Sequence, residues 1–305
     1  MGLPRIGFIG VGKMGGPMVR RLLAAGFAVT VHDLRRDAVA EVCRSGAAAS
    51  DSPATAAAGA DVVITMLPDG RAVEGVAYGA RGLLAGLRSG QTLIEMTSSS
   101  PGVTRRLAAV LDPQGIRLLD APVSGGVRGA VEGTLCIMVG GPADLLEACR
   151  PILECLGRDL VHVGDAPGDG DTAKTINNFL SATTVWSVAE GAALAAKAGL
   201  SLDRVMAAVN RSTGRSYTTE TKVLRYMLPR QFTSGFTVAQ YLKDLTICLE
   251  LAGELGVPML LGSMLRQAWL LAAQEGMAEQ DHTALVCLLE RWSGVGTDRP
   301  RDGAG

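Results

Sequence analysis

The sequence is poor in aromatic residues and in histidine. Aromatic side chains make up 4% of the 305 residues, and the three histidines (His32, His162 and His282) have no metal-type spacing. An aromatic-rich β-sandwich is therefore disfavoured, whereas 39 glycines and 48% hydrophobic residues favour close-packed helices and tight turns. We expect a large core and no metal site.

The chain also lacks an excess of one charge. Its formal net charge is −1, and its basic residues form no block. Binding to nucleic acid or to an anionic membrane therefore has no electrostatic support. No uninterrupted apolar run reaches the length of a membrane span, and the first strand begins too early to leave room for a signal peptide.

None of the six cysteines belongs to a CxxC pair, and most lie in apolar surroundings. We interpret them as reduced, buried small hydrophobic residues of a cytoplasmic protein.

A glycine-rich turn follows the first apolar run. Residues 5–10 (RIGFIG) are typical of a β-strand, residues 10–15 read GVGKMG, and a helical stretch comes next. G-x-G-x-x-G between a strand and a helix is the dinucleotide fingerprint, because the glycines permit the tight turn, the approach of the pyrophosphate and close helix packing. The pyrophosphate would lie at the helix N-terminus. We expect the cofactor to contact Gly10, Gly12, Lys13, Met14 and Gly15.

Asp33 follows the next expected strand, residues 27–32 (FAVTVH). An acidic residue about 20 residues past the glycines accepts hydrogen bonds from the ribose hydroxyls of NAD and repels the 2′-phosphate of NADP. Arg35 and Arg36 come next, and an arginine there can bind that phosphate. The sequence favours NAD and leaves NADP open.

Strand and helix patterns alternate up to residue 164. Further strands are expected over residues 61–67, 91–96, 116–120, 136–139 and 160–163. This rhythm predicts an α/β domain with a mostly parallel, doubly wound sheet over residues 1–164. Ligands bind beyond the carboxyl ends of such strands, although ordinary turn chemistry also explains polar strand ends. The candidates to line the cofactor are Leu67, Pro68, Thr97 and Ser98.

Residues 120–126 (DAPVSGG) follow the fifth strand. A Ser-Gly-Gly turn frees successive backbone N–H groups and adds a hydroxyl, which suits a carboxylate. Ser124, Gly125 and Gly126 are therefore candidates for substrate binding, and a simple loop is the alternative.

A second glycine-rich bend, GDGD, leads into a long apolar helix expected over residues 172–198. Lys174 and Asn178 are four residues apart, so they share one face of that helix. The positive end of the helix dipole, with partial burial, would ease release of the Lys174 proton and suit it to acid–base catalysis. Asp169 and Asp171 would oppose this effect. The alternative is an ordinary solvated lysine.

Four motifs in this order resemble the β-hydroxyacid dehydrogenase family, in particular its 3-hydroxyisobutyrate dehydrogenase branch. The resemblance covers roughly residues 5 to 292 and rests on residues 7–18 (GFIGVGKMGGPM), 120–135 (DAPVSGGVRGAVEGTL), 168–178 (GDGDTAKTINN) and 243–245 (KDL). It implies a Rossmann domain joined by the long helix to an all-helical domain over residues 165–293, as in 6-phosphogluconate dehydrogenase.

The resemblance implies roles in catalysis and substrate binding. Lys174 would be the general acid/base, and Asn178 would help to hold the substrate. The substrate carboxylate would be bound by Ser124, Gly125 and Gly126.

The resemblance also implies contacts with the cofactor. Lys243 would lie beside the nicotinamide, with Phe236 as a further candidate there. The dinucleotide would be contacted by Thr97, Ser98 and Leu67.

The second half of the sequence has an almost entirely helical pattern. After Gly199 we expect helices at about 202–211, 216–228, 237–255, 258–275 and 281–291, and a disordered tail over residues 294–305. Many small apolar residues on these helices favour packing against a second copy, so we expect a homodimer or homotetramer.

Taken together, the motifs predict a dehydrogenase that uses NAD, with NADP left open, to interconvert a short β-hydroxy acid and its semialdehyde or keto acid. Three alternatives stay open. They are an NADPH-dependent glyoxylate or succinic semialdehyde reductase, an imine reductase of the same architecture, and a non-catalytic dinucleotide-binding module.

Overall fold

The computed structural model describes residues 2–295. The chain divides into two compact units, residues 1–175 and residues 176–305. From residue 296 on, the tail expected to be disordered lies outside the described residues.

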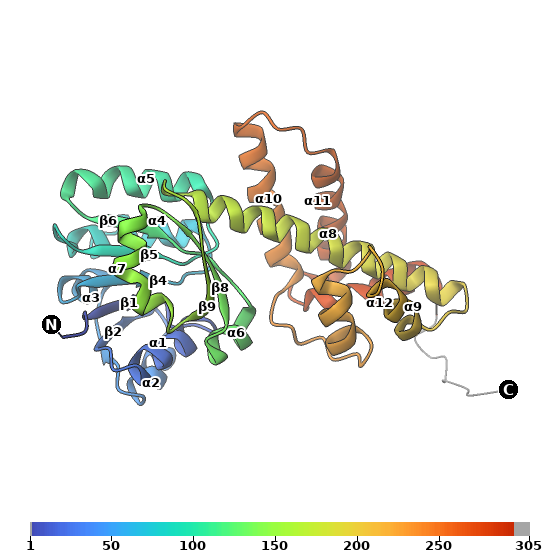
Figure 1. Ribbon diagram of the computed structural model, residues 1–305, viewed down its shortest axis with the longest axis horizontal. Coiled ribbons are helices and arrows are strands. Elements are labelled where there is room, and N and C mark those ends of the chain that lie inside the picture. The colour runs from blue at the N-terminus through green and yellow to red at the C-terminus, as the bar shows by residue number, and fades with distance from the viewer. Residues whose placement is uncertain (1, 296–305) are drawn as a thin grey trace. The chain divides into compact units, whose positions relative to one another are not determined.

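The first unit is built on a nine-stranded sheet (Figure 1). Its order is β3-β2-β1-β4-β5-β6-β8-β7, with β9 beside β8, and all pairs from β3 to β6 are parallel. Strand β8 runs antiparallel to β6 and β7, and β9 is parallel to β8. The expected mostly parallel, doubly wound sheet is confirmed. The strands are β1 (Ile6–Ile9), β2 (Val29–His32), β3 (Ala48–Ala49), β4 (Val62–Thr65), β5 (Thr92–Glu95), β6 (Arg117–Asp120), β7 (Val123–Ser124), β8 (Leu135–Gly140) and β9 (Gly157–Gly164).

Two of these strands were not expected from the sequence. Strands β3 and β7 have two residues each, too few for an alternating hydrophobic pattern. Ser124 therefore ends a short strand, whereas the sequence predicted a turn from Ser124 to Gly126.

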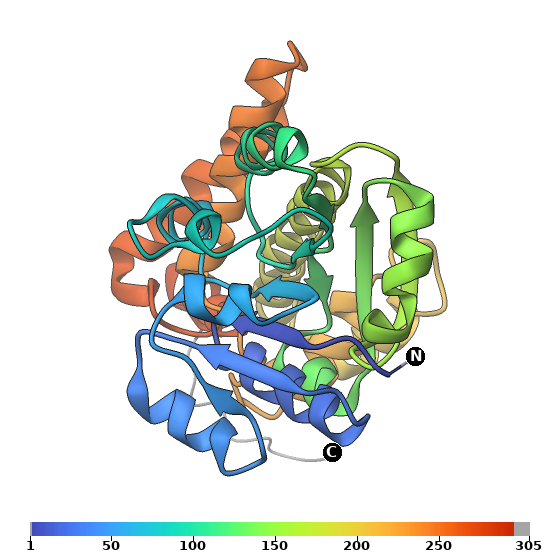
Figure 2. The same ribbon diagram turned by 90° about the vertical axis from the view of Figure 1, so that its left-hand side faces the viewer.

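Helices cover both faces of the sheet (Figure 2). Phe8 and Ile64 pack into one core with α1, α2, α6 and α7, whereas the adjacent Ile9 and Val63 pack into another with α3, α4 and α5. Because side chains alternate along a strand and both faces are buried, these strands read as continuous apolar runs. The helices of this unit are α1 (Gly15–Ala24), α2 (Arg36–Cys43), α3 (Pro53–Ala58), α4 (Gly70–Tyr78), α5 (Pro101–Leu111), α6 (Gly126–Glu132) and α7 (Ala143–Leu153), with the short η1 (Leu83–Ala85) and η2 (Asp112–Gln114).

The long helix α8 (Asp169–Lys197) has 29 residues, which corresponds to ~43 Å. It begins three residues before the predicted start at Thr172 and ends before Gly199, whose φ is +73°. The division between the two units falls inside it, after Thr175. The boundaries expected from the sequence, 1–164 and 165–293, stay a prediction.

Helix α8 qualifies the expectation that no segment could span a membrane. Among the described residues it is long and apolar enough to do so by length and composition alone, since Ser, Thr and Gly interrupt its apolar residues only mildly. Its buried side chains, such as Val185 and Ala189, belong to the core of the second unit. A core helix of a soluble protein passes the same test.

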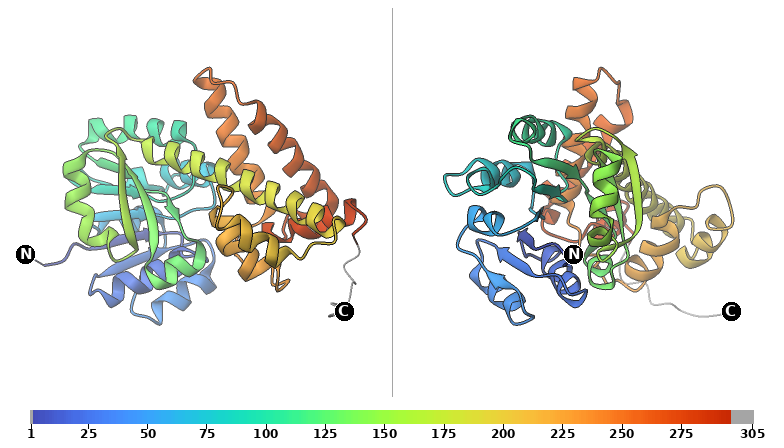
Figure 3. Two further views of the ribbon diagram at one scale, coloured as in Figure 1. Left: turned by 45° about the vertical axis from the view of Figure 1, so that its right-hand side comes forward. Right: turned by 60° about the vertical axis from the view of Figure 1, so that its left-hand side comes forward.

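The second unit is helical, as predicted. Its core concentrates several of the few aromatic residues, with the Trp269 ring 5.7 Å from Trp186 and 4.9 Å from Tyr241. Helices α10 and α11 form a hairpin (Figure 3). The segment predicted as an α-helix over 216–228 is η3, which has the wider π-helical winding. After α8, the elements are α9 (Leu202–Val209), η3 (Thr218–Met227), α10 (Val238–Glu254), α11 (Leu260–Ala272), η4 (Ala273–Met277), η5 (His282–Ala284) and α12 (Leu285–Trp292).

Candidate active site

The glycine-rich turn has the geometry of a dinucleotide cradle. Gly10 has a φ of +95°, and a Cβ there would overlap the Met66 carbonyl. A Cβ on Gly15 would overlap the Gly10 carbonyl, so α1 packs against β1 only with glycine there. In contrast, a Cβ on Gly12 would meet only Arg35 Nη2, at 3.6 Å, among the described atoms within 4 Å. The backbone before α1 is thus open, which fits a bound pyrophosphate.

Asp33 is held towards this turn by backbone groups. Its Oδ2 accepts from Val11 N at 2.8 Å, and its Oδ1 accepts from Arg35 N at 2.8 Å. The Asp33 side chain is 14% exposed, whereas that of Arg35 is 58% exposed. The carboxylate is therefore fixed at the end of β2, where a ribose hydroxyl would be bound. The exposed Arg35 guanidinium borders the same cradle, with its Nε 3.8 Å from Asp33 Oδ1.

The loops after β4 and β5 are joined to each other. Leu67 N donates to Thr97 Oγ1 at 3.0 Å, and Thr97 N donates to Glu95 Oε1 at 2.8 Å. The Leu67 side chain reaches the turn at Gly10. Pro68 is exposed and Ser98 half-buried beside this junction, so the loops expected to contact the cofactor meet at one edge of the sheet.

Three carboxyl groups lie buried beside that edge: Glu95 and Asp120, which are register partners at the ends of β5 and β6, and Asp171 in the first turn of α8. Burial raises the pKa of Glu95 to about 8, and the charge of Asp120 adds to the rise. Burial also raises the pKa of Asp120 and of Asp171, the latter helped by the charge of Glu95. Because burial and nearby negative charge both disfavour the ionised form, each of the three groups gives up its proton less readily than an isolated carboxyl does.

These three residues were not among the predicted site residues. The sequence suggested instead that Asp171 would hold the Lys174 proton more tightly. A carboxyl that keeps its own proton provides less negative charge for that purpose. The available signal was an acidic residue at the end of two neighbouring strands, since strand ends of a parallel sheet share an edge.

Lys174 lies in the second turn of α8 and is 9% exposed. Ser124 pairs with Cys136 of β8. The Cys136 thiol has a pKa raised first by burial and then by Asp159, and the positive charge of Lys174 opposes the rise. The first unit thus brings the Lys174 ammonium near the strand pair that carries Ser124. The next residues, Gly125 and Gly126, have φ angles of +130° and +63°, which favour glycine.

The remaining predicted residues lie in the second unit. Asn178 Nδ2 donates to Asp244 Oδ2 at 2.6 Å, and Lys243 Nζ lies 3.2 Å from Asp244 Oδ1. Asp244 therefore holds two predicted site residues. The sequence did not predict a role for Asp244 beyond its place in the KDL motif. Phe236 packs edge-on against Tyr241, with ring centroids 4.8 Å apart.

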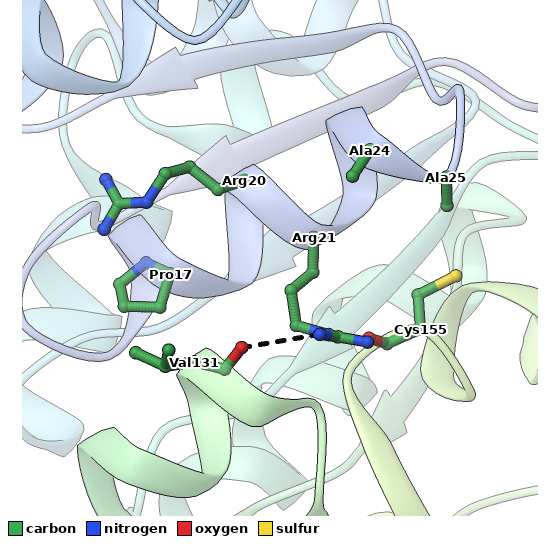
Figure 4. Close-up of a pocket in the computed structure, with 7 residues that line it drawn as sticks. All are labelled: Pro17, Arg20, Arg21, Ala24, Ala25, Val131 and Cys155. Carbon is green, nitrogen blue, oxygen red and sulfur yellow. Dashed lines mark hydrogen bonds between the residues drawn. The ribbon is translucent and has the colours of Figure 1, made fainter.

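A cavity of about 450 Å³ in the first unit includes none of the predicted site residues (Figure 4). Arg21 of α1 crosses it and donates to the carbonyl oxygens of Cys155, at 2.6 Å, and Val131, at 3.4 Å. Its guanidinium is thus engaged by the protein backbone. The lining residues are Pro17, Arg20, Arg21, Ala24, Ala25, Val131 and Cys155.

Comparisons with known proteins match both halves of the chain. A family model described as the NAD binding domain of 6-phosphogluconate dehydrogenase matches residues 5–164, and one described as NAD-binding of NADP-dependent 3-hydroxyisobutyrate dehydrogenase matches residues 168–289.

Three individual proteins are similar over nearly the whole length. 2-(Hydroxymethyl)glutarate dehydrogenase of Eubacterium barkeri is 38% identical, over 95% of this chain and 96% of its own. NAD-dependent L-serine dehydrogenase of Pseudomonas aeruginosa is 36% identical, over 96% and 100%. The solved structure of Mycobacterium tuberculosis 3-hydroxyisobutyrate dehydrogenase with L-serine is 33% identical, covers 94% and 99%, and superposes with a TM-score of 0.88.

Proposed function

Because this chain belongs to the β-hydroxyacid dehydrogenase family of NAD(P)-dependent dehydrogenases, we propose that it interconverts a short β-hydroxy acid and its semialdehyde or keto acid. The preferred substrate would be of the 3-hydroxyisobutyrate type. One observation carries the proposal: α8, which holds the buried Lys174, begins in close backbone contact with β8 at Gly140, and β8 pairs with Ser124. A proton-transfer group and a carboxylate-binding turn are then available to one small molecule.

The residues would divide the work as follows. The Ser124 hydroxyl and the N–H groups of Gly125 and Gly126 bind the substrate carboxylate, and Asn178 steadies the substrate. Lys174 takes the proton of the substrate hydroxyl during oxidation and returns a proton to the carbonyl oxygen during reduction. The nicotinamide, when bound, supplies or accepts the hydride. Lys243, with Phe236, would border the nicotinamide.

The named substrates of the relatives share one arrangement. L-Serine, 2-(hydroxymethyl)glutarate and 3-hydroxyisobutyrate all carry a hydroxymethyl group on the carbon next to a carboxylate, and they differ in the other substituent. A common arrangement matches one carboxylate turn and one base. The substrates of the relatives differ in the other substituent on that carbon. An assay should therefore compare hydroxy acids that vary in this substituent.

We propose NAD as the preferred cofactor. The fixed carboxylate of Asp33 supports this choice, because it can accept from a ribose hydroxyl and would repel a 2′-phosphate. Arg35 favours the second candidate, an NADPH-dependent glyoxylate or succinic semialdehyde reductase, since its guanidinium borders Gly12.

The test is initial rate against a panel of hydroxy acids with NAD and with NADP, namely 3-hydroxyisobutyrate, 3-hydroxypropionate, serine, glycerate, threonate and 4-hydroxybutyrate. We expect NADH formation on at least one acid, and Lys174→Ala should lower kcat by about 10²–10⁴-fold. Turnover only of glyoxylate or succinic semialdehyde with NADPH would favour the second candidate. If no acid and no matching aldehyde were turned over, the proposal would be refuted in favour of an imine substrate or a binding role.

We further propose a homodimer or homotetramer in the cytoplasm. The second unit exposes large apolar side chains on α11, including Leu260 (87% exposed) and Met264 (66%). A second copy would remove this surface from water. The six cysteines are free thiols, in keeping with a reducing compartment. A monomer by light scattering at micromolar concentration would refute the homo-oligomer. Release of the protein from cells by osmotic shock would refute the cytoplasmic location.

A further inference from the structure

The start of α8 is tied to the sheet through the side chain of Asp120. Asp120 Oδ1 accepts from Gly168 N at 2.9 Å, and Asp120 Oδ2 accepts from Asp171 N at 2.9 Å. These are N–H groups of the helix start, which have no partner within the helix. A carboxylate from the end of β6 therefore caps α8 in place of a residue next to it in the chain.

A second set of bonds joins α8 to the loop after β5 and to α5, which follows that loop. Asp171 Oδ1 accepts from Ser99 N at 3.4 Å, and Asp171 Oδ2 accepts from Thr104 Oγ1 at 2.6 Å. Ser99 directly follows Thr97 and Ser98, the residues proposed to contact the dinucleotide. Asp171 thus joins the cofactor loop to the helix that carries Lys174, one turn further on.

The backbones at this joint are also in close contact. A Cβ on Gly170 would lie 2.5 Å from Met138 O and 2.7 Å from Asp120 O. A Cβ on Gly140 of β8 would lie 2.6 Å from Gly170 N. Real Cβ atoms essentially never come within 3.0 Å of other atoms, so the first turn of α8 rests on β6 and β8 with little freedom to move.

We propose that Asp171, with Asp120, is a positioning residue that fixes Lys174 relative to the loops after β5 and β6. The inference rests on the proposed role of Lys174 as general acid/base. Asp171 touches neither substrate nor cofactor in this account and acts through hydrogen bonds alone. The raised pKa of the buried carboxyl supports this, because a group that retains its proton is replaceable by a neutral amide.

The decisive variants are Asp171→Asn and Asp171→Ala. An asparagine can accept from Ser99 N and donate to Thr104 Oγ1, so both bonds survive; alanine removes both. We expect Asp171→Ala to lower kcat by about 10–100-fold, since a displacement of ~1 Å can cost about 10²-fold. Asp171→Asn should stay within about threefold of the wild type. Thr104→Val, which removes only the hydroxyl, should have a smaller effect in the same direction.

The readout must separate positioning from a loss of folded protein. The solvent deuterium isotope effect on kcat does so, because it is a ratio that the fraction of active molecules does not change. A misplaced Lys174 slows proton transfer, so this effect should rise in Asp171→Ala and Thr104→Val and stay at the wild-type value in Asp171→Asn.

The matched control is Gln91→Ala, at the opposite end of β5. Gln91 is 8% exposed and donates to the carbonyls of Ala57 and Ala60 at 2.8 and 2.6 Å. This variant should lower the Tm without changing the isotope effect.

Two results would overturn the inference. One is a folded Asp171→Ala with wild-type kcat and isotope effect, or, should that variant not fold, a Thr104→Val with both values unchanged. The other is an Asp171→Asn as impaired as the alanine variant, which would mean that charge matters and hydrogen bonding does not. Turnover by Lys174→Ala would instead refute the proposed function, so the two failures are distinguishable.

Discussion

At the scale of single residues, we expect cofactor choice to depend on Asp33. Replacing it with serine removes the fixed charge at the end of β2, and hydrogen bonds to charged groups contribute about 1.5–3 kcal/mol. We expect Asp33→Ser to lower kcat/KM for NAD by about 10–100-fold, and to lower it less for NADP. Asp37→Asn, which removes an exposed carboxylate in the first turn of α2, is the control. If Asp33→Ser left the ratio of kcat/KM for NAD to kcat/KM for NADP unchanged, the role given to Asp33 would be wrong.

Glu95 links stability to pH. Its folded-state pKa of about 8 lies above the ordinary value of 4.5, so the folded protein holds the proton when the unfolded chain has lost it. Stability is therefore lost as pH rises from about 4.5 to about 8. Glu95→Gln, which is neutral throughout, should have a higher Tm than the wild type at pH 8 and a similar Tm at pH 4.5. If the Tm of Glu95→Gln and that of the wild type changed equally with pH, the pKa of Glu95 would not be raised.

At the scale of elements, the close fit of α8 against β6 and β8 can be tested by replacing two glycines of α8, one at a time, with alanine. Gly170→Ala forces an atom against the Met138 carbonyl and should destabilise the protein by about 1–3 kcal/mol. Gly191→Ala lies on the same helix, and its Cβ meets no described atom within 4 Å, so it should stabilise by about 0.5–1 kcal/mol. Urea unfolding measures both. If Gly170→Ala also raised the free energy of unfolding, the contact between α8 and the two strands would not be tight.

At the scale of the whole molecule, one buried group in each unit links stability to pH, and the two links have opposite signs. In the second unit, burial lowers the pKa of His282 to about 4, from an ordinary value of 6.5, with the charge of Lys222 adding to the effect. The unfolded chain then takes up a proton first, so stability is lost as pH falls from about 6.5 to about 4. The carboxyl group of Glu95 has the reverse effect. The two ranges overlap between about pH 4.5 and pH 6.5, where the two effects oppose each other, so the Tm should be highest in that interval and fall on both sides of it.

The acid limb of that profile can be assigned with one variant. His282 Nδ1 lies 2.9 Å from the Phe236 carbonyl, a bond that an asparagine side chain can also make. We expect His282→Asn to lose less of its Tm than the wild type between pH 6.5 and pH 4.5. If both proteins lose the same amount, another group causes the acid sensitivity.

Much of this protein is encoded locally in its sequence. The glycine turn before α1, the alternation of strands and helices, and the spacing of Lys174 and Asn178 depend on backbone sterics and periodicity within a few residues. These features, with the family motifs, predicted the sheet, the helical second unit and the dinucleotide-binding class. They did not specify the two-residue strands β3 and β7, which exist only because a neighbouring strand pairs with them.

Only the tertiary structure decided which distant groups meet. Asp120 caps α8 across 48 residues of chain, and Asp244 holds Asn178 across 66. The early start of α8 follows from the first of these contacts. The raised pKa values of Glu95, Asp120 and Asp171 follow from burial in one place, because loss of solvent and mutual repulsion depend on what surrounds a carboxyl in space. The sequence determined which groups could do the chemistry, whereas the packing of strand ends against α8 determined how those in the first unit are held.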